Sequence, residues 1–180
     1  VLFRSVMKSV FYHHCKDLGT LPTVTQYEGP CFQHVENLSD GKGVIFCDNA
    51  ANFRENVFTT KQVKGTEYRA YFINHEVVAI YRKQKLTKGP ATPIKNSTNG
   101  YGYILNPKEQ AKDLFRYIKE LTLECSNRIG MSYGAVDFIV DKEYLIHILE
   151  ANSAPTLLSE QVLVAFAIGI NNLYGDKYES

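Results

Sequence analysis

Two carboxylates and one amide stand at matching positions in the segment DFIVDKEYLIHILEANSAP, which begins at Asp137. Because successive side chains of a strand point to opposite faces, Ile148, Glu150 and Asn152 are predicted to share one face of the second strand. A hairpin turn at residues 142–143 pairs Asp137 with Ile148 and makes it a diagonal neighbour of Glu150. Such hard oxygen ligands suit Mg²⁺, which is commonly shared with nucleotide phosphates. The alternative is a pair of ordinary solvated strand ends.

A short glycine-containing turn, SDGKGV, lies between two predicted strands upstream. Gly41 and Gly43 allow the backbone to approach an anion closely, and Lys42 with the N–H groups of the turn can hold a phosphate. The alternative is a turn that only reverses the chain. The sequence is not a Walker loop, because no GxxxxGK[ST] motif opens a helix here.

A strand, a glycine-containing connector and two basic strands follow this turn. The first strand ends at Val63, where a hinge can expose backbone groups to a base edge while Glu67 accepts hydrogen bonds from ribose hydroxyls. Arg69, Lys83 and Lys85 lie on strands and can face phosphates or a substrate carboxylate. The alternative is an exposed sheet edge protected by its basic residues.

The element order predicts an α+β fold. Apolar spacing and turn residues predict helices at 5–18, from Asn106 to Gly130, and from Ser159 to 173. Strands are predicted at 31–37, 44–47, 56–63, 68–73 and 76–85, followed by the hairpin that contains Asp137 and Glu150. Residues 87–102, rich in Lys, Pro, Asn, Thr and Gly, are predicted as a long loop.

Composition limits the classes of partner. The chain has 180 residues, 44% of them hydrophobic, which is enough to bury a sizeable core. Its formal net charge of +1 argues against a nucleic-acid or membrane partner, so any anion site must be local. Four cysteines without CxxC or zinc-finger spacing, and no apolar run long enough to cross a bilayer, predict a cytoplasmic protein with reduced thiols. The oligomeric state is not determined by the sequence.

Taken together, residues 30 to 160 resemble the ATP-grasp superfamily, including D-alanine–D-alanine ligases, RimK-type glutamate ligases and phage-like ATP-grasp proteins. The resemblance rests on the order of the glycine turn, the hinge, GTEYR, the basic strand, IKNSTNG, the long helix and DFIVD…ILEANSAP. It implies two small α+β lobes with largely antiparallel sheets that grip a nucleotide. Residues 31–62 would form the small lobe and residues 63–180 the large lobe, with residues 1–30 as the remnant of an N-terminal region.

The resemblance also implies residue roles. Asp137, Glu150 and Asn152 would hold Mg²⁺, or Mn²⁺, between the phosphates of ATP. The ATP-binding residues it implies, together with those expected from the strands above, are Gly41, Lys42, Gly43, Lys61, Gln62, Val63, Glu67 and Lys85. The catalytic residues would be Arg69 and Lys83, facing the phosphates or an acyl-phosphate, and Asn96, near substrate and metal.

The implied reaction is ATP-dependent joining of a carboxylate to an amine, with small-molecule or peptide substrates. Two features favour an alternative, a nucleotide-binding module without ligase activity. The strand before the glycine turn carries Gln33 and His34 where the family usually has Lys or Arg, and only about 30 residues precede the resemblance.

Overall fold

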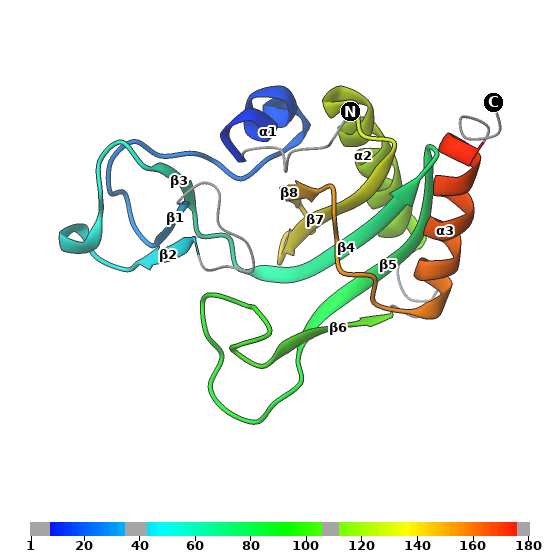
Figure 1. Cartoon of the computed structure of the whole chain (residues 1–180). Helices are drawn as coiled ribbons and strands as arrows, with labels where there is room; N and C mark the ends of the chain where they lie inside the picture. The colour runs from blue at the N-terminus through cyan, green and yellow to red at the C-terminus, as the bar shows by residue number, and fades with distance from the viewer. Residues whose placement is uncertain (1–7, 35–42, 106–111, 176–180) are drawn as a thin grey trace.

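The computed structural model describes residues 8–34, 43–105 and 112–175 (Figure 1). The helices in these residues are α1 (Lys8–Cys15), η1 (Lys16–Leu18), η2 (Ala50–Asn52), α2 (Lys112–Ile129) and α3 (Glu160–Tyr174). The strands are β1 (Cys31–His34), β2 (Val44–Cys47), β3 (Phe58–Lys61), β4 (Gly65–Ile73), β5 (Glu76–Lys85), β6 (Tyr101–Leu105), β7 (Tyr133–Asp141) and β8 (Ile146–Asn152). The predicted α+β class is confirmed. None of the described helices is long and apolar enough to cross a membrane.

The strands form two sheets. The smaller has the order β2-β1-β3 and the larger the order β6-β5-β4-β7-β8, and every pairing of neighbours in both sheets is antiparallel. The chain passes from one sheet to the other between Lys61 and Gly65. That position coincides with the predicted boundary between the lobes, although the division into lobes stays a prediction.

Local sequence signals account for several element ends. Asn74 and His75 adopt φ of 50° and 62°, the left-handed conformation that a tight two-residue hairpin turn requires, and join β4 to β5 as predicted. Gly130, at φ 66°, follows α2 as predicted, whereas the predicted helix start at Asn106 lies outside the described residues. The Ser159 hydroxyl accepts a hydrogen bond from the Val162 N–H at 3.3 Å and caps α3 as predicted.

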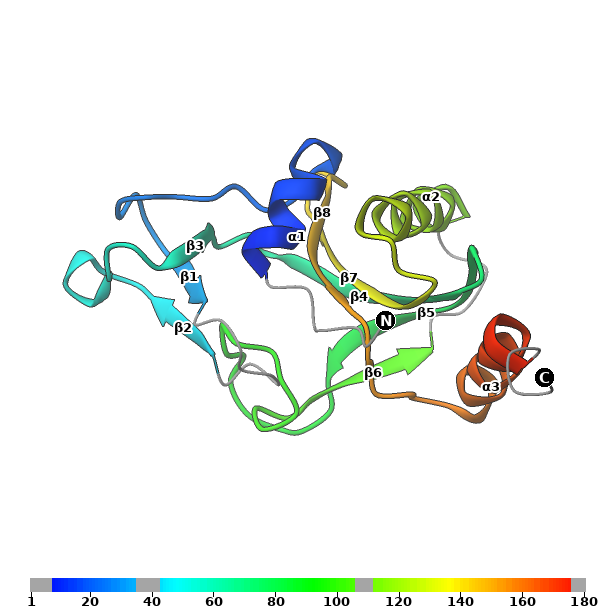
Figure 2. The ribbon, with the colours of Figure 1, turned by 45° about the horizontal axis from the view of Figure 1, so that its top comes forward.

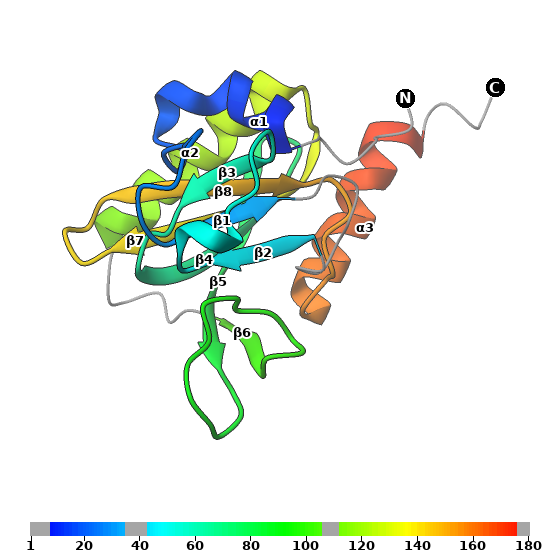
Figure 3. The ribbon, with the colours of Figure 1, turned by 90° about the vertical axis from the view of Figure 1, so that its left-hand side faces the viewer.

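The prediction of one unbroken loop from residue 87 to 102 was wrong at its end, because Tyr101 and Gly102 begin β6. This strand pairs with β5 along the edge of the large sheet, with Tyr103 opposite Lys83. Gly100, just before the strand, and Gly102, within it, made this segment resemble a loop, and the strand forms because it pairs with β5. The remaining loop projects from the sheet edge (Figures 1 and 3).

The predicted register of β7 and β8 was also wrong. The hairpin has three loop residues rather than two, closed by Tyr144 at φ 63°, and a bulge follows between Ile148 and Glu150. Asp137 therefore lies directly opposite Glu150, not Ile148. A one-residue shift alone would have turned Glu150 to the other face, and the second shift at the bulge returns it to the face of Asp137.

Helices cover the two faces of the large sheet (Figure 2). On one face, α1 and α2 bury Phe11, Ile118 and Phe138 in the larger core cluster. On the other face, α3 packs Phe166 against Tyr71 and their neighbours. Alternate residues of β4 point to opposite faces of the sheet. Glu67 and Arg69 therefore lie on the same face as Tyr71, beyond the part of that face that α3 covers.

Candidate functional site

The predicted metal-binding residues lie together at the β7–β8 end of the exposed sheet face. The Asn152 Nδ2 atom is 3.2 Å from Asp137 Oδ2 and 3.4 Å from Glu150 Oε1. Oxygen donors from two paired strands suit Mg²⁺, although the amide must rotate to offer its oxygen instead of its NH₂ group. No group of three His, Cys, Asp or Glu side chains in the described part of the chain is arranged for a metal, and the predicted set has two carboxylates plus the amide. The ligand role stays a prediction.

Arg69 neutralises one of these carboxylates. Its Nε and Nη2 atoms each donate to an Asp137 oxygen at 2.7 Å, and the two side chains are only 15% and 8% exposed. Burial lowers the pKa of Arg69, but the adjacent Asp137 carboxylate outweighs burial and holds that pKa above its ordinary value. The guanidinium of Arg69 is therefore charged, and its bidentate contact with Asp137 is largely shielded from water.

Glu67 joins two further cations. Its carboxylate oxygens lie 2.7 Å from Lys83 Nζ and 3.1 Å from Lys95 Nζ, and Lys95 also donates to the Gly65 carbonyl at 3.0 Å. Burial lowers the pKa of Lys83, but the charge of Glu67 more than offsets it, so the pKa stands above its usual value. Together with a cavity of about 230 Å³ beside Glu67, this arrangement places positive charge at an open part of the surface. The role of Lys95 was not predicted from the sequence.

Lys8 is a second residue that the sequence analysis missed. Its Nζ atom lies 2.7 Å from Glu150 Oε2 and 3.4 Å from His34 Nδ1. Burial raises the pKa of Glu150, but Lys8 and, to a lesser degree, Asn152 outweigh it, so this pKa lies below the ordinary value. Burial, followed by the charge of Lys8, lowers the pKa of His34 to about 3 and keeps its imidazole neutral. The sequence offered one signal for Lys8: the strand before the glycine turn has no Lys or Arg where the resemblance leads us to expect one, so a cation from elsewhere in the chain can take that place.

We refer to the seven charged side chains that form these ion pairs as the charged cluster. Its members are Lys8, Glu67, Arg69, Lys83, Lys95, Asp137 and Glu150. Gln33 has no part in it, because its side chain is fully buried and bonds to Arg54 and Thr59 within the small-sheet region. These hydrogen bonds hold the Gln33 side chain inside the small-sheet region, so Gln33 does not take the place of the Lys or Arg that the resemblance leads us to expect on this strand.

The predicted hinge lies between the two sheets. The backbone N–H groups of Lys61 and Gln62 donate to the carbonyls of Pro22 and Pro30, at 2.8 and 3.0 Å. The Lys61 side chain pairs with Glu28 at 2.9 Å. Val63 packs against the larger core cluster. These contacts fix the connector in place, and its role in binding adenine stays a prediction.

The other predicted residues lie around the β5–β6 loop, just before β2, or outside the described residues. Lys85 Nζ donates to the carbonyls of Pro90 and Asn99, at 2.5 and 3.5 Å, and so anchors the β5–β6 loop. Asn96 lies in the same loop, where its side-chain oxygen accepts from the Asn99 N–H at 3.0 Å. Gly43 is buried just before β2. Gly41 and Lys42 lie outside the described residues.

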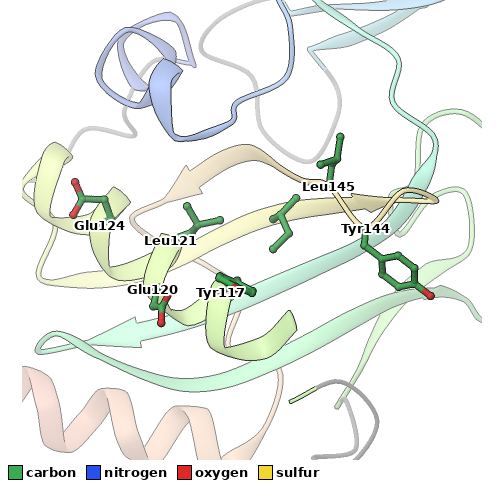
Figure 4. Close-up of a pocket in the computed structure, with 7 residues that line it drawn as sticks. Tyr117, Glu120, Leu121, Glu124, Tyr144 and Leu145 are labelled. Carbon is green, nitrogen blue, oxygen red and sulfur yellow. The ribbon is translucent and has the colours of Figure 1, made fainter. Parts of the chain in front are cut away.

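A larger hollow of about 540 Å³ lies elsewhere, between α2 and the β7–β8 turn (Figure 4). It is mostly apolar and is lined in part by Tyr117, Leu121 and Leu145. No predicted site residue lines it, so its size does not identify it as the nucleotide site.

Comparison with solved structures identifies the fold. D-alanine–D-alanine ligase from Bacillus anthracis superimposes with a TM-score of 0.69 at 16% identity, over 92% of this chain and 63% of the ligase. The same ligase complexed with ATP gives a TM-score of 0.62 at 14% identity, over 93% and 63% of the two chains. The ATP-grasp ligase PsnB, complexed with a phosphomimetic variant of its minimal precursor, Mg and ADP, gives 0.61 at 12% identity, over 91% and 56%.

The protein therefore has the ATP-grasp fold, and the fold expected from the sequence is confirmed. The chain spans less than two thirds of the length of these structures. No family model and no curated protein matches the sequence. Among the structural neighbours are ligases whose complexes contain ATP, or Mg and ADP.

Proposed function

We propose that this chain binds MgATP over the charged cluster and forms the nucleotide-binding part of a carboxylate–amine ligase. The observation that carries the proposal is the convergence of Asp137, Glu150 and Asn152 with the largely buried cations Arg69 and Lys83 on one sheet face of an ATP-grasp fold. A structural ion-pair network by itself has no need of an open cavity beside it.

The charge balance of the cluster supports a polyanionic ligand. It contains four cations and three carboxylates, and every carboxylate already has a cationic partner. A free Mg²⁺ ion would have to displace Lys8 from Glu150 and would add positive charge to the cluster. Phosphates offer new partners to Lys8, Arg69 and Lys83, so we expect the metal to bind together with the nucleotide.

Each residue then has a defined task. Asp137, Glu150 and Asn152 would hold Mg²⁺, which neutralises phosphate charge when bound. Lys8, Arg69 and Lys83 bind and orient the phosphates, while Glu67 accepts hydrogen bonds from the ribose. Attack of a substrate carboxylate on the terminal phosphate of ATP breaks the bond to ADP and gives an acyl-phosphate; the amine then attacks the acyl carbon, forms the amide bond and releases inorganic phosphate and a proton. The substrates are small-molecule or peptide carboxylates and amines; PsnB complexed with a precursor peptide illustrates the peptide case for that protein.

The second candidate is a nucleotide-binding module without ligase activity. The neutral His34, at a position where the resemblance leads us to expect a permanent cation, favours it. Lys8 argues against it, because its ammonium lies 3.4 Å from the His34 ring and can replace the missing charge.

Calorimetric titration of ATP, with and without Mg²⁺, tests the binding proposal. We expect Mg²⁺-dependent binding by the native chain and a loss of about tenfold or more for Glu150→Ala. Glu124→Ala is the matched control, since Glu124 is an exposed glutamate paired with Arg128 on α2. Equal affinity with and without Mg²⁺, or an unchanged Glu150→Ala variant, would refute the proposed site.

Release of ADP separates the two candidates. The native chain and Glu150→Ala are incubated with MgATP and sets of acids and amines. Release that requires both an acid and an amine supports the ligase. Nucleotide binding without release for any pair supports the binding module.

A further inference from the structure

Tyr103, on the edge strand β6, lies against two cations of the charged cluster. It pairs directly with Lys83 across β5 and β6. Its ring centroid is 4.7 Å from Arg69 Cζ and 5.2 Å from Lys83 Nζ. These distances fall within the range in which the negative face of an aromatic ring attracts a cation.

The two cations that touch Tyr103 belong to different ion pairs. Arg69 is bound by Asp137, on β7, and Lys83 by Glu67, on β4. Tyr103 is thus the side chain that contacts both pairs from the sheet edge. Burial, and then the nearby Asp137 carboxylate, raise the pKa of its phenol, so the ring stays uncharged over the neutral pH range.

We propose that Tyr103 is a positioning residue of the nucleotide site, whose ring holds the Arg69 guanidinium and the Lys83 ammonium in the orientation that phosphates require. The inference rests on the proposed function. Its physical basis is that a guanidinium bound along one edge by a carboxylate keeps fewer accessible orientations when an aromatic ring also lies against it. A site whose cations are already oriented loses less conformational entropy when the anion binds.

A purely structural role for Tyr103 gives a different expectation. The ring also packs against the apolar cluster that contains Tyr71 and Phe166, so its removal can lower stability without affecting the site. The two roles are separated by Tyr103→Phe and Tyr103→Leu. The Phe variant keeps the ring, and the Leu variant keeps only apolar volume.

MgATP affinity, measured by calorimetry on the full chain, is the first readout. We expect Tyr103→Leu to bind about tenfold more weakly than the native chain. Tyr103→Phe should lose clearly less affinity than Tyr103→Leu, because it keeps the ring that lies against both cations. Tyr117→Leu is the matched control, since Tyr117 contacts Arg116 at 5.1 Å on the surface of α2. Native affinity in Tyr103→Leu, or equal losses in the Phe and Leu variants, would overturn the proposal.

A nucleotide-free readout keeps this inference distinct from the proposed function. The Nε–H resonance of Arg69, assigned with Arg69→Lys, reports in ¹⁵N NMR spectra how firmly the guanidinium is held. We expect a slowly exchanging signal in the native chain and in Tyr103→Phe, and faster exchange in Tyr103→Leu. Unchanged exchange refutes the positioning role even if the native chain binds no ATP. Tyr103→Met, whose longer and more flexible side chain adapts to the space left by the ring, replaces the Leu variant if that variant does not fold.

Discussion

Replacing Asp137 with Asn is expected to destabilise the protein by about 3 kcal/mol, because it leaves the largely buried Arg69 guanidinium without its counter-charge. The two side chains are 15% and 8% exposed, and they share two hydrogen bonds of 2.7 Å. An uncompensated charge with so little access to water costs far more than the net contribution of the intact pair. For a chain of this size, that loss corresponds to a fall of about 6–12 °C in the unfolding midpoint.

The double variant Arg69→Met with Asp137→Leu removes both charges together. Since the desolvation cost of the pair disappears with its attraction, we expect its stability to lie within about 1 kcal/mol of the native protein. Its nucleotide binding should nevertheless be lost. A double variant that is as stable as the native protein but binds no nucleotide would show that the ion pair serves binding and not stability.

Urea unfolding followed by circular dichroism measures these differences, with thermal unfolding as a second measurement. Asp17→Asn is the control, because Asp17 forms a more exposed pair with Arg128, so its replacement should destabilise the protein much less than Asp137→Asn. A loss below about 1 kcal/mol for Asp137→Asn would refute the reasoning, since it would mean that water or another side chain solvates Arg69. A double variant as unstable as the single one would also contradict it.

Three further predictions follow from single residues. Gly134→Ala should destabilise the fold by more than about 1 kcal/mol in urea, because φ is +154° and a Cβ atom would lie 2.6 Å from the Asn152 carbonyl oxygen; native stability would contradict this. His34 is neutral when folded, with a pKa of about 3, while the unfolded side chain gains a proton below about pH 6.5. Its contribution to stability is therefore complete above pH 6.5 and falls as the pH drops toward 3, by about 2 kcal/mol at pH 5; unfolding curves for His34→Gln should show a smaller fall, and an identical fall would refute the assignment. Lys8→Met should weaken MgATP binding by about tenfold or more in calorimetry, and unchanged affinity would exclude Lys8 from the site.

Local sequence patterns were sufficient to predict much of the fold. The β4–β5 hairpin was predicted because two apolar strands flank Asn74 and His75, and both residues accept the turn conformation. The N-cap at Ser159 and the end of α2 at Gly130 also depend on neighbouring residues. Such features follow from backbone conformations and hydrogen bonds within a few residues, so the sequence contains their signals directly.

The candidate site was only partly predictable. Asp137, Glu150 and Asn152 lie on one face of the sheet as predicted, but the register from which this was predicted was wrong. A third loop residue closed by Tyr144 and a bulge each shifted the register by one, and together they kept the three side chains on one face. Neither irregularity has a clear signature in the sequence, because each depends on how the second strand packs against the sheet.

The sequence by itself determined the types of chemical group available, the α+β class and most of the strands and helices, since these depend on residue identity and local periodicity. Only the tertiary structure decided which charges meet. Lys8 reaches Glu150 from α1, Lys95 reaches Glu67 from a loop, and Tyr103 reaches Arg69 from the sheet edge. Each contact joins residues far apart in the chain, and it forms because the burial of helix and sheet faces fixes the backbone that carries the side chains.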